Sequence, residues 1–209
     1  MECYISDSCK KANCCDMNNT GLCQRLFRFN ALLNNGLLTE RQKIGCNLTL
    51  SGNDIDREKY EQLKEIKESI FSRVKNGENF YIYSTTTGNG KTEWSLKLLR
   101  EYVRHIWAEA AADECRVLFI SVPKFLISLK ENISHKSEYV EAIRASVYSA
   151  DLVVWDDIGS KCGTEFEIEN MLSIINARLE SCNLDNIYKS KSGAKISVIA
   201  YGTAITYAK

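Results

Sequence analysis

The chain has 209 residues, which is enough for one ordinary α/β domain with a small appendage and too few for two full-sized domains. Hydrophobic residues make up 44% and charged residues 26%, a balance that excludes disordered and collagen-like chains. Because 27 basic residues match 27 acidic ones, the average charge does not favour nucleic-acid binding, and only a local patch could provide it.

The N-terminal residues Met1–Tyr4 lack the basic and then apolar pattern of a signal segment. No apolar run in the sequence reaches the ~18–20 residues that a membrane-spanning helix needs. We therefore expect a soluble cytoplasmic protein that does not associate with a membrane.

Cysteines gather near the N-terminus, where five of the nine fall within the first 23 residues. An odd total without an export signal argues against disulfides, because the cytosol keeps thiols reduced. Four thiolates would suit a tetrahedral zinc ion, and we assign them to Cys3, Cys9, Cys15 and Cys23, with Cys14 as an equal alternative to Cys15. The spacing is irregular and contains no C-x-x-C pair, so a segment of free thiols is the competing interpretation.

We divide the chain near Asn53. Residues 1–52 contain the cysteines and an apolar amphipathic stretch, Leu26–Leu38, and we expect this region to bind zinc and contact a partner. Residues 53–209 form the main domain, in which strand-like and helix-like segments alternate.

The main domain begins with a helix, capped by Asp54 or Asp56, that runs to about Lys75 with Gly77 just beyond its end. The strand-like segments that follow are Phe80–Tyr83, Arg116–Ser121, Leu152–Trp155 and Lys195–Tyr201. Helices are expected over about Lys91–Trp107, from Pro123, over Tyr139–Tyr148, and after the capping-box pair Thr164 and Glu167. This alternation predicts right-handed crossovers and a parallel sheet between helices, which is an α/β fold.

A Thr- and Gly-rich loop, Thr85–Thr92, joins the first strand to the next helix. Gly90, Lys91 and Thr92 fit the end of the phosphate-binding pattern G-x-x-x-x-G-K-[ST], while Thr85 stands where its first glycine belongs. The backbone amides after Thr86, at Thr87, Gly88 and Asn89, can curl around a phosphate at the helix N-terminus. Lys91 can bridge the β- and γ-phosphates and Thr92 can ligate Mg²⁺. A Gly-rich turn that binds nothing is the alternative.

Two acids follow the third strand. Leu152–Trp155 provides four apolar residues, and Asp156 and Asp157 come directly after them. We assign Asp156 to the Mg²⁺ shell and Asp157 to orienting or activating a water molecule, with helix capping as the alternative role. Because both motifs occur in the right order at strand ends, together they predict a P-loop site for ATP and Mg²⁺.

The sequence resembles the DnaC/DnaI/IstB group of AAA+ ATPases, and most closely the Firmicute or phage DnaC/DnaI-type replicative helicase loaders. The matching segments are ordered along about Lys59–Leu179 and comprise Gly88–Thr92, Ile120–Pro123, Asp156–Gly159 and Ile174–Arg178. The Cys-rich start is similar in kind to the zinc-bearing, helicase-contacting regions of such loaders.

This resemblance implies an AAA+ core with a Rossmann-like sheet over residues 53–209, in which Lys91, Thr92, Asp156 and Asp157 hold ATP and magnesium. It also implies a function, which is to engage a replicative DNA helicase and help place it on single-stranded DNA during replication initiation. We expect weak hydrolysis of ATP to ADP and phosphate, with Lys91 and Asp157 taking part. A replicative helicase and single-stranded DNA are the partners, and self-association is a further option.

The C-terminal part departs from the group. Its members have a strand that ends in Thr-Ser-Asn, whereas Asn186–Lys191 carries lysines at the Thr and Asn positions. Either Lys195–Tyr201 supplies this strand, or the C-terminal sequence is altered, as by truncation or a change of reading frame. No arginine finger is evident, so ATP binding is better supported than hydrolysis.

Other functions are compatible with the same core. One is an IstB-type transposition ATPase, and another is a nucleotide-binding interaction module without useful turnover. Single-stranded DNA could contact the basic residues that follow the second strand, Lys124, Lys130, Lys136 and Arg144. Acids are interspersed among them, so a solvated helical face is the alternative.

Overall fold

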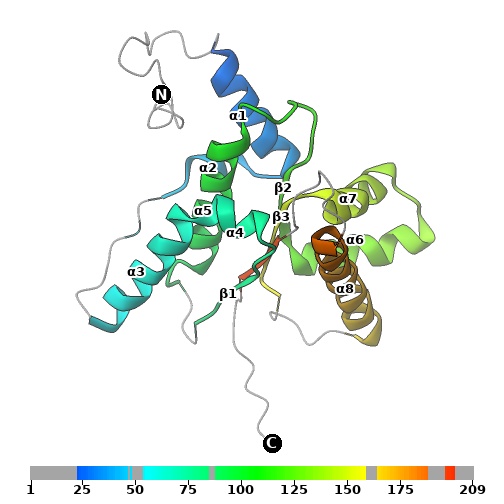
Figure 1. The fold of residues 1–209 in the computed structure, drawn as a ribbon. Helices are drawn as coiled ribbons and strands as arrows, with labels where there is room; N and C mark the ends of the chain where they lie inside the picture. Colours follow the sequence, from blue (N-terminus) through cyan, green and yellow to red (C-terminus); the bar gives the residue numbers. More distant parts are fainter. Residues whose placement is uncertain are drawn as a thin grey trace, which may run out of the picture.

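The computed structural model describes residues 23–46, 48, 54–84, 88–158, 164–187 and 196–200 (Figure 1). Its helices are α1 (Gln24–Asn35), α2 (Glu40–Ile44), α3 (Asp54–Glu68), α4 (Ile70–Lys75), α5 (Lys91–Ile106), α6 (Val122–Ser134), α7 (Glu138–Ser149) and α8 (Glu165–Ile187). Its strands are β1 (Phe80–Ile82), β2 (Val117–Ser121), β3 (Leu152–Asp156) and β4 (Ile196–Ala200). None of the helices described is both long and apolar enough to pass through a membrane.

The four strands form one parallel sheet in the order β1-β4-β3-β2. The strand expected over Lys195–Tyr201 is confirmed as β4. Although β4 comes last in the chain, it lies between β1 and β3. Ala200 pairs with Ile82 on one side and with Asp156 on the other, so the carboxyl ends of these strands are level. Any group that follows β1 or β3 therefore emerges at the same edge of the sheet.

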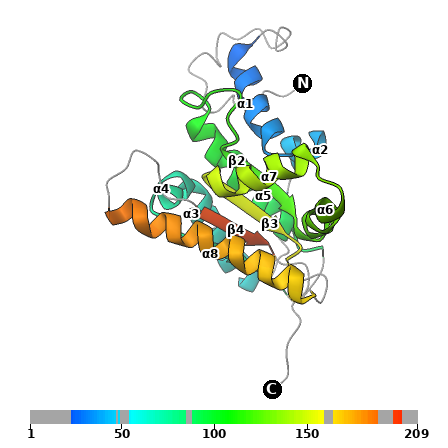
Figure 2. The same cartoon turned by 90° about the vertical axis from the view of Figure 1, so that its right-hand side faces the viewer.

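Alternate residues of β2 and β3 face two separate hydrophobic cores, as expected for strands buried on both sides. Val117, Phe119, Leu152 and Val154 pack with α1, α4 and α5, and the intervening residues pack with α6, α7 and α8. Figure 1 shows the two groups of helices on opposite sides of the sheet, and Figure 2 looks onto the side that α6, α7 and α8 cover. The predicted α/β sandwich is thus confirmed.

Helix α1 belongs to the first of these cores. Its residues Phe29, Leu32 and Leu33 are fully buried and pack in the same cluster as residues of α5 and β2. At the end of α1, the Gly36 carbonyl accepts a hydrogen bond of 2.9 Å from the Phe119 amide of β2. A Cβ at Gly36 would lie 2.9 Å from the Val117 carbonyl oxygen, so this close approach requires glycine. The core thus includes residues from both sides of the division expected near Asn53, because Phe29, Leu32, Leu33 and Leu38 pack with residues of α4, α5 and the sheet.

The helix expected to run unbroken to Lys75 is divided at Ser69, which separates α3 from α4. The Ser69 hydroxyl donates to the Glu65 carbonyl at 2.7 Å, a local bond that competes with regular helix geometry. The expected stop at Gly77 is confirmed. Gly77 adopts φ of 73°, and the amides of Gly77 and Glu78 donate to the carbonyls of Val74 and Arg73, which closes the helix in a Schellman motif.

Candidate nucleotide-binding site

The connection from β1 to α5 carries the glycines that the sequence singled out. Gly88 and Gly90 have φ of 75° and 84°, a region in which side chains are strained. A Cβ at Gly90 would also lie 2.9 Å from a methyl group of Leu48. Helix α5 begins directly afterwards at Lys91, so its N-terminal amides and the positive end of its dipole face the end of this loop.

Lys91 is the first residue of α5, and its ammonium group donates to the Asn89 side-chain oxygen at 3.1 Å. This bond keeps the positive charge over the loop, beside the helix N-terminus. A triphosphate placed there would meet both the ammonium group and the backbone amides. The geometry therefore suits the phosphate contact that the sequence assigned to Lys91.

The Thr92 hydroxyl donates a hydrogen bond of 2.9 Å to a carboxylate oxygen of Asp156, at the end of β3. Asp156 is buried, with 9% of its surface exposed, and this burial raises its pKa from 3.8 to about 6. The hydrogen bond from Thr92 and the charge of Lys91 oppose that rise, while the charge of Asp157 adds to it. Hydroxyl and carboxylate oxygens are the ligands that Mg²⁺ takes in phosphate sites, so this pair fits the metal expected here.

Asp157 follows with φ of 58°, which is unusual for a residue other than glycine. Aspartate tolerates this left-handed conformation better than most residues, and here it directs the chain away from β3. Asp157 is half-buried and lines the same cavity as Lys91 and Thr92. The two neighbouring acids therefore differ in burial, and the division of roles between them stays a prediction.

The cavity beside the loop measures about 510 Å³, within the usual range for small-molecule sites. One part of its lining comprises Gly88–Glu93 with Asp157, and a second part comprises Arg41, Gln42, Gly45 and Cys46. These four residues were not among the predicted site residues, because they fall in the region 1–52 that was expected to contact a partner. No local pattern in Arg41–Cys46 could have identified them, since they meet the phosphate loop only through the tertiary fold.

Several predicted site residues lie outside the described residues, namely Thr86 and Thr87 of the loop and the zinc candidates Cys3, Cys9 and Cys15, together with the alternative Cys14. Cys23 is described. It is a half-exposed free cysteine at the start of α1. Within the described ranges, no three His, Cys, Asp or Glu side chains come together as a metal cluster. The zinc site therefore stays a prediction.

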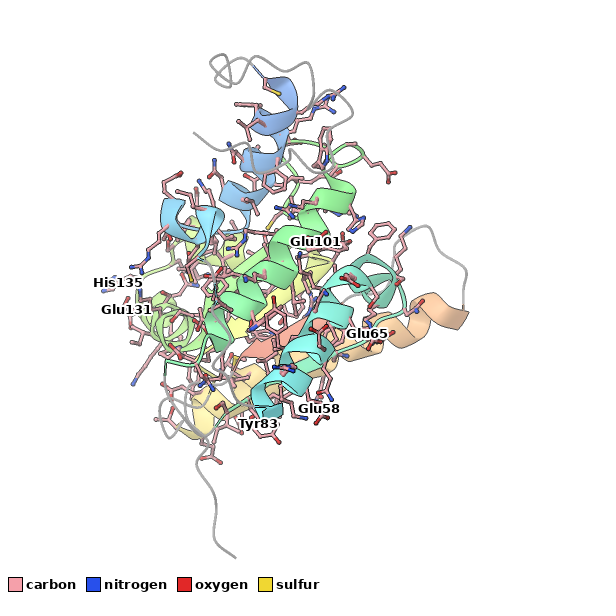
Figure 3. All side chains as sticks on the ribbon, turned by 90° about the vertical axis from the view of Figure 1, so that its left-hand side faces the viewer. Glu58, Glu65, Tyr83, Glu101, Glu131 and His135 are labelled. Atoms are coloured by element: carbon pink, nitrogen blue, oxygen red, sulfur yellow. The ribbon has the colours of Figure 1, made fainter. Side chains whose placement is uncertain are left out.

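The basic residues considered for DNA contact are all exposed, with Lys124 and Lys130 on α6, Lys136 just beyond it and Arg144 on α7. Exposed acids share these helices, and Figure 3 shows Glu131 beside His135 at the end of α6. The Asn132 amide donates to Glu141 at 2.5 Å, so one of the acids is engaged within the protein. Contact with single-stranded DNA at these helices stays a prediction.

The sequence matches no protein-family model and no curated protein. Among solved structures, the fold is similar to that of AMPPCP-bound DnaA from Aquifex aeolicus, with a TM-score of 0.42 and 20% sequence identity. The likeness covers 74% of this chain and 43% of that one, so this chain spans less than half of that protein.

Proposed function

We propose that this chain binds ATP and Mg²⁺ in the 510 Å³ cavity lined by the Gly88–Thr92 loop and by Arg41, Gln42, Gly45 and Cys46. The observation that carries the proposal is the 2.9 Å hydrogen bond between Thr92 and Asp156, which joins the phosphate loop to the end of β3. Two independent sequence motifs thus meet at one point, as a P-loop site requires.

Each residue then has a definite task. The backbone amides at the start of α5 and the Lys91 ammonium group would hold the phosphates, and the oxygens of Thr92 and Asp156 would hold Mg²⁺. The metal, when bound, neutralises charge on the phosphates. Asp157 would accept a hydrogen bond from a water molecule and orient it toward the terminal phosphate.

Nucleotide binding is tested by calorimetry with ATP in the presence of Mg²⁺. Lys91→Ala removes one charged contact and should weaken binding by about 1.5–3 kcal/mol. Lys97→Ala is the matched control, since Lys97 lies on the same helix, over the Trp94 ring, and does not line the cavity. Equal ATP affinity in wild type and Lys91→Ala would contradict the assignment.

We further propose that the chain is a helicase loader that uses ATP to engage a replicative DNA helicase and help place it on single-stranded DNA. The support is the ordered set of motifs shared with DnaC/DnaI-type loaders, two of which, Gly88–Thr92 and Asp156–Gly159, contribute residues to the cavity. The test is a pull-down with the replicative helicase of the same genome, with and without ATP. Retention that depends on ATP and is lost in Lys91→Ala supports the loader.

Other outcomes identify the other functions. Regular oligomers on double-stranded DNA without helicase capture would indicate an IstB-type transposition ATPase. Tight ATP binding with neither phosphate release nor helicase capture would indicate an interaction module.

A further inference from the structure

Residues 42–46 and Leu48 lie against the first three turns of α5 and against the phosphate loop, and we call them the strap. Three contacts hold it to the phosphate loop and α5. The Gln42 carbonyl accepts from Arg100, the Cys46 amide donates to Glu93, and the side chain of Leu48 covers Gly90. The strap is therefore attached to α5 itself, the helix whose first residues are Lys91 and Thr92.

Arg100 and Glu93 make two of these contacts. They lie two turns apart on one face of α5, and the Arg100 guanidinium donates to the Glu93 carboxylate at 2.5 Å and to the Gln42 carbonyl at 2.5 Å. The same Glu93 oxygen accepts from the Cys46 amide at 3.2 Å. Both charged side chains are largely buried, with 12% and 14% of their surfaces exposed, so they need these partners to offset their desolvation.

The backbone of the strap requires glycine at position 45. Gly45 has φ of 77°, and a Cβ there would lie 2.4 Å from a terminal guanidinium nitrogen of Arg100 and 2.8 Å from the Glu93 carboxylate. The backbone at Gly45 thus rests directly on the ion pair. Gly45 and Cys46 also line the cavity, together with the loop that would hold the phosphates.

We propose that Arg100 and Glu93 are positioning residues for the nucleoside half of the ligand, because they hold the strap as the cavity wall that the base and ribose contact. The inference rests on the proposed nucleotide site. Neither side chain needs to touch the phosphates. The pair therefore sets the ratio of the protein's affinity for ATP to its affinity for tripolyphosphate, which lacks the nucleoside. An ion pair that merely stabilised α5 would affect both ligands alike.

The first test compares ATP with inorganic tripolyphosphate, both with Mg²⁺, by calorimetry on the full chain. Arg100→Met should raise the Kd for ATP about tenfold or more, a change of roughly 1.4 kcal/mol, while the Kd for tripolyphosphate changes less than about twofold. Arg104→Met is the control, because Arg104 lies on the same helix, pairs with Glu101 and does not line the cavity. This control should leave the ratio of the two affinities unchanged.

Two further variants separate positioning from charge and from folding. Arg100→Lys keeps the charge but cannot donate to Gln42 and Glu93 with one planar fork, so it should restore only part of the ATP preference. Gly45→Ala keeps both charged residues but forces the strap away from them, and it should lose the preference as Arg100→Met does. Thermal unfolding without ligand shows which variants fold. If Arg100→Met does not fold, the ATP and tripolyphosphate affinities of Gly45→Ala test the positioning role.

The chain also provides a natural probe of the wall, the exposed thiol of Cys46. ATP should slow alkylation of Cys46 by iodoacetamide, tripolyphosphate should not, and ATP should lose this protection in Arg100→Met. Cys115 serves as the internal reference in peptide mapping, because it lies on the far side of the fold from the loop, before β2, and burial raises the pKa of its thiol.

The outcomes are distinguishable. Equal losses of ATP and tripolyphosphate affinity, or no loss of either, would overturn the positioning role while leaving the nucleotide site intact. A wild-type chain that binds neither ligand would overturn the proposed function and this inference together.

Discussion

The Thr92 hydroxyl and the Asp156 carboxylate meet at 2.9 Å although 64 positions separate them in the sequence. The parallel sheet makes this contact possible, because β1 leads into the loop and the start of α5 at the same edge where β3 ends in Asp156. Magnesium bound between the two oxygens would replace a hydrogen bond that already holds them close together. Because the two oxygens are already close together, ordering them around a cation would cost less free energy.

Asp156 and Asp157 should differ when each is replaced by asparagine. Asp156→Asn removes a metal ligand and should weaken Mg²⁺-dependent ATP binding roughly tenfold. Asp157→Asn should leave that binding largely intact and suppress any turnover, and asparagine tolerates the φ of 58° that this position requires. Calorimetry with and without Mg²⁺ measures the first effect, and phosphate release measures the second. Identical binding defects in the two variants would show that the roles are not divided.

Burial of Asp156 should make the ligand-free chain lose stability as the pH rises. Its folded pKa of about 6 exceeds the ordinary 3.8, so the folded state binds this proton more tightly than the unfolded state does. The stabilisation is complete below about pH 3.8 and is lost as the pH rises through 6. Because asparagine does not titrate, the stability of Asp156→Asn relative to wild type should increase by roughly 1 kcal/mol between pH 5 and pH 7.5. Denaturant unfolding without magnesium or nucleotide measures this difference, and a difference that is constant with pH would contradict it.

The cysteines at the N-terminus should hold one zinc ion per chain. A segment of about 25 residues cannot bury enough apolar surface to fold alone, and a metal usually supplies the missing free energy. Cys3, Cys9 and Cys23 with one of Cys14 and Cys15 would complete a tetrahedron, while the remaining cysteine of that adjacent pair stays free. Elemental analysis of protein purified without added metal tests this. A zinc content near zero with all five thiols reactive would return the segment to free cysteines.

The order of helices and strands could be predicted because it follows from local patterns. Buried strands such as Leu152–Trp155 are short apolar runs, and the capping pair Thr164 and Glu167 marks a helix start that the structure confirms. The Gly-Lys-Thr end of the loop and the paired acids are also local, so the phosphate side of the site could be predicted.

The position of β4 and the second part of the cavity lining could not be predicted in the same way. Nothing in Ile196–Ala200 specifies that it inserts between β1 and β3, because strand order is decided by packing over the whole sheet. The strap depends on contacts such as that between Arg100 and Gln42, which lie 58 positions apart. Because the first 23 residues are rich in cysteine, we expected residues 1–52 to form one separate region. The packing of α1 on the sheet could not be predicted from that pattern.

That packing gives a direct test of where the core begins. Leu33 of α1 is fully buried among residues of α5 and β2, so Leu33→Ala should leave a cavity and lower the free energy of unfolding by about 2–5 kcal/mol. Phe27→Ala is the matched control on the same helix, since Phe27 is 68% exposed and should change stability little. Denaturant unfolding is followed by fluorescence of Trp155, which lies in β3 and faces the other core, with Trp94 and Trp107 replaced by phenylalanine. If α1 and the sheet form one cooperative unit, the Trp155 transition shifts with Leu33→Ala by the full amount. A Trp155 transition that Leu33→Ala leaves in place would show that α1 unfolds separately from the sheet.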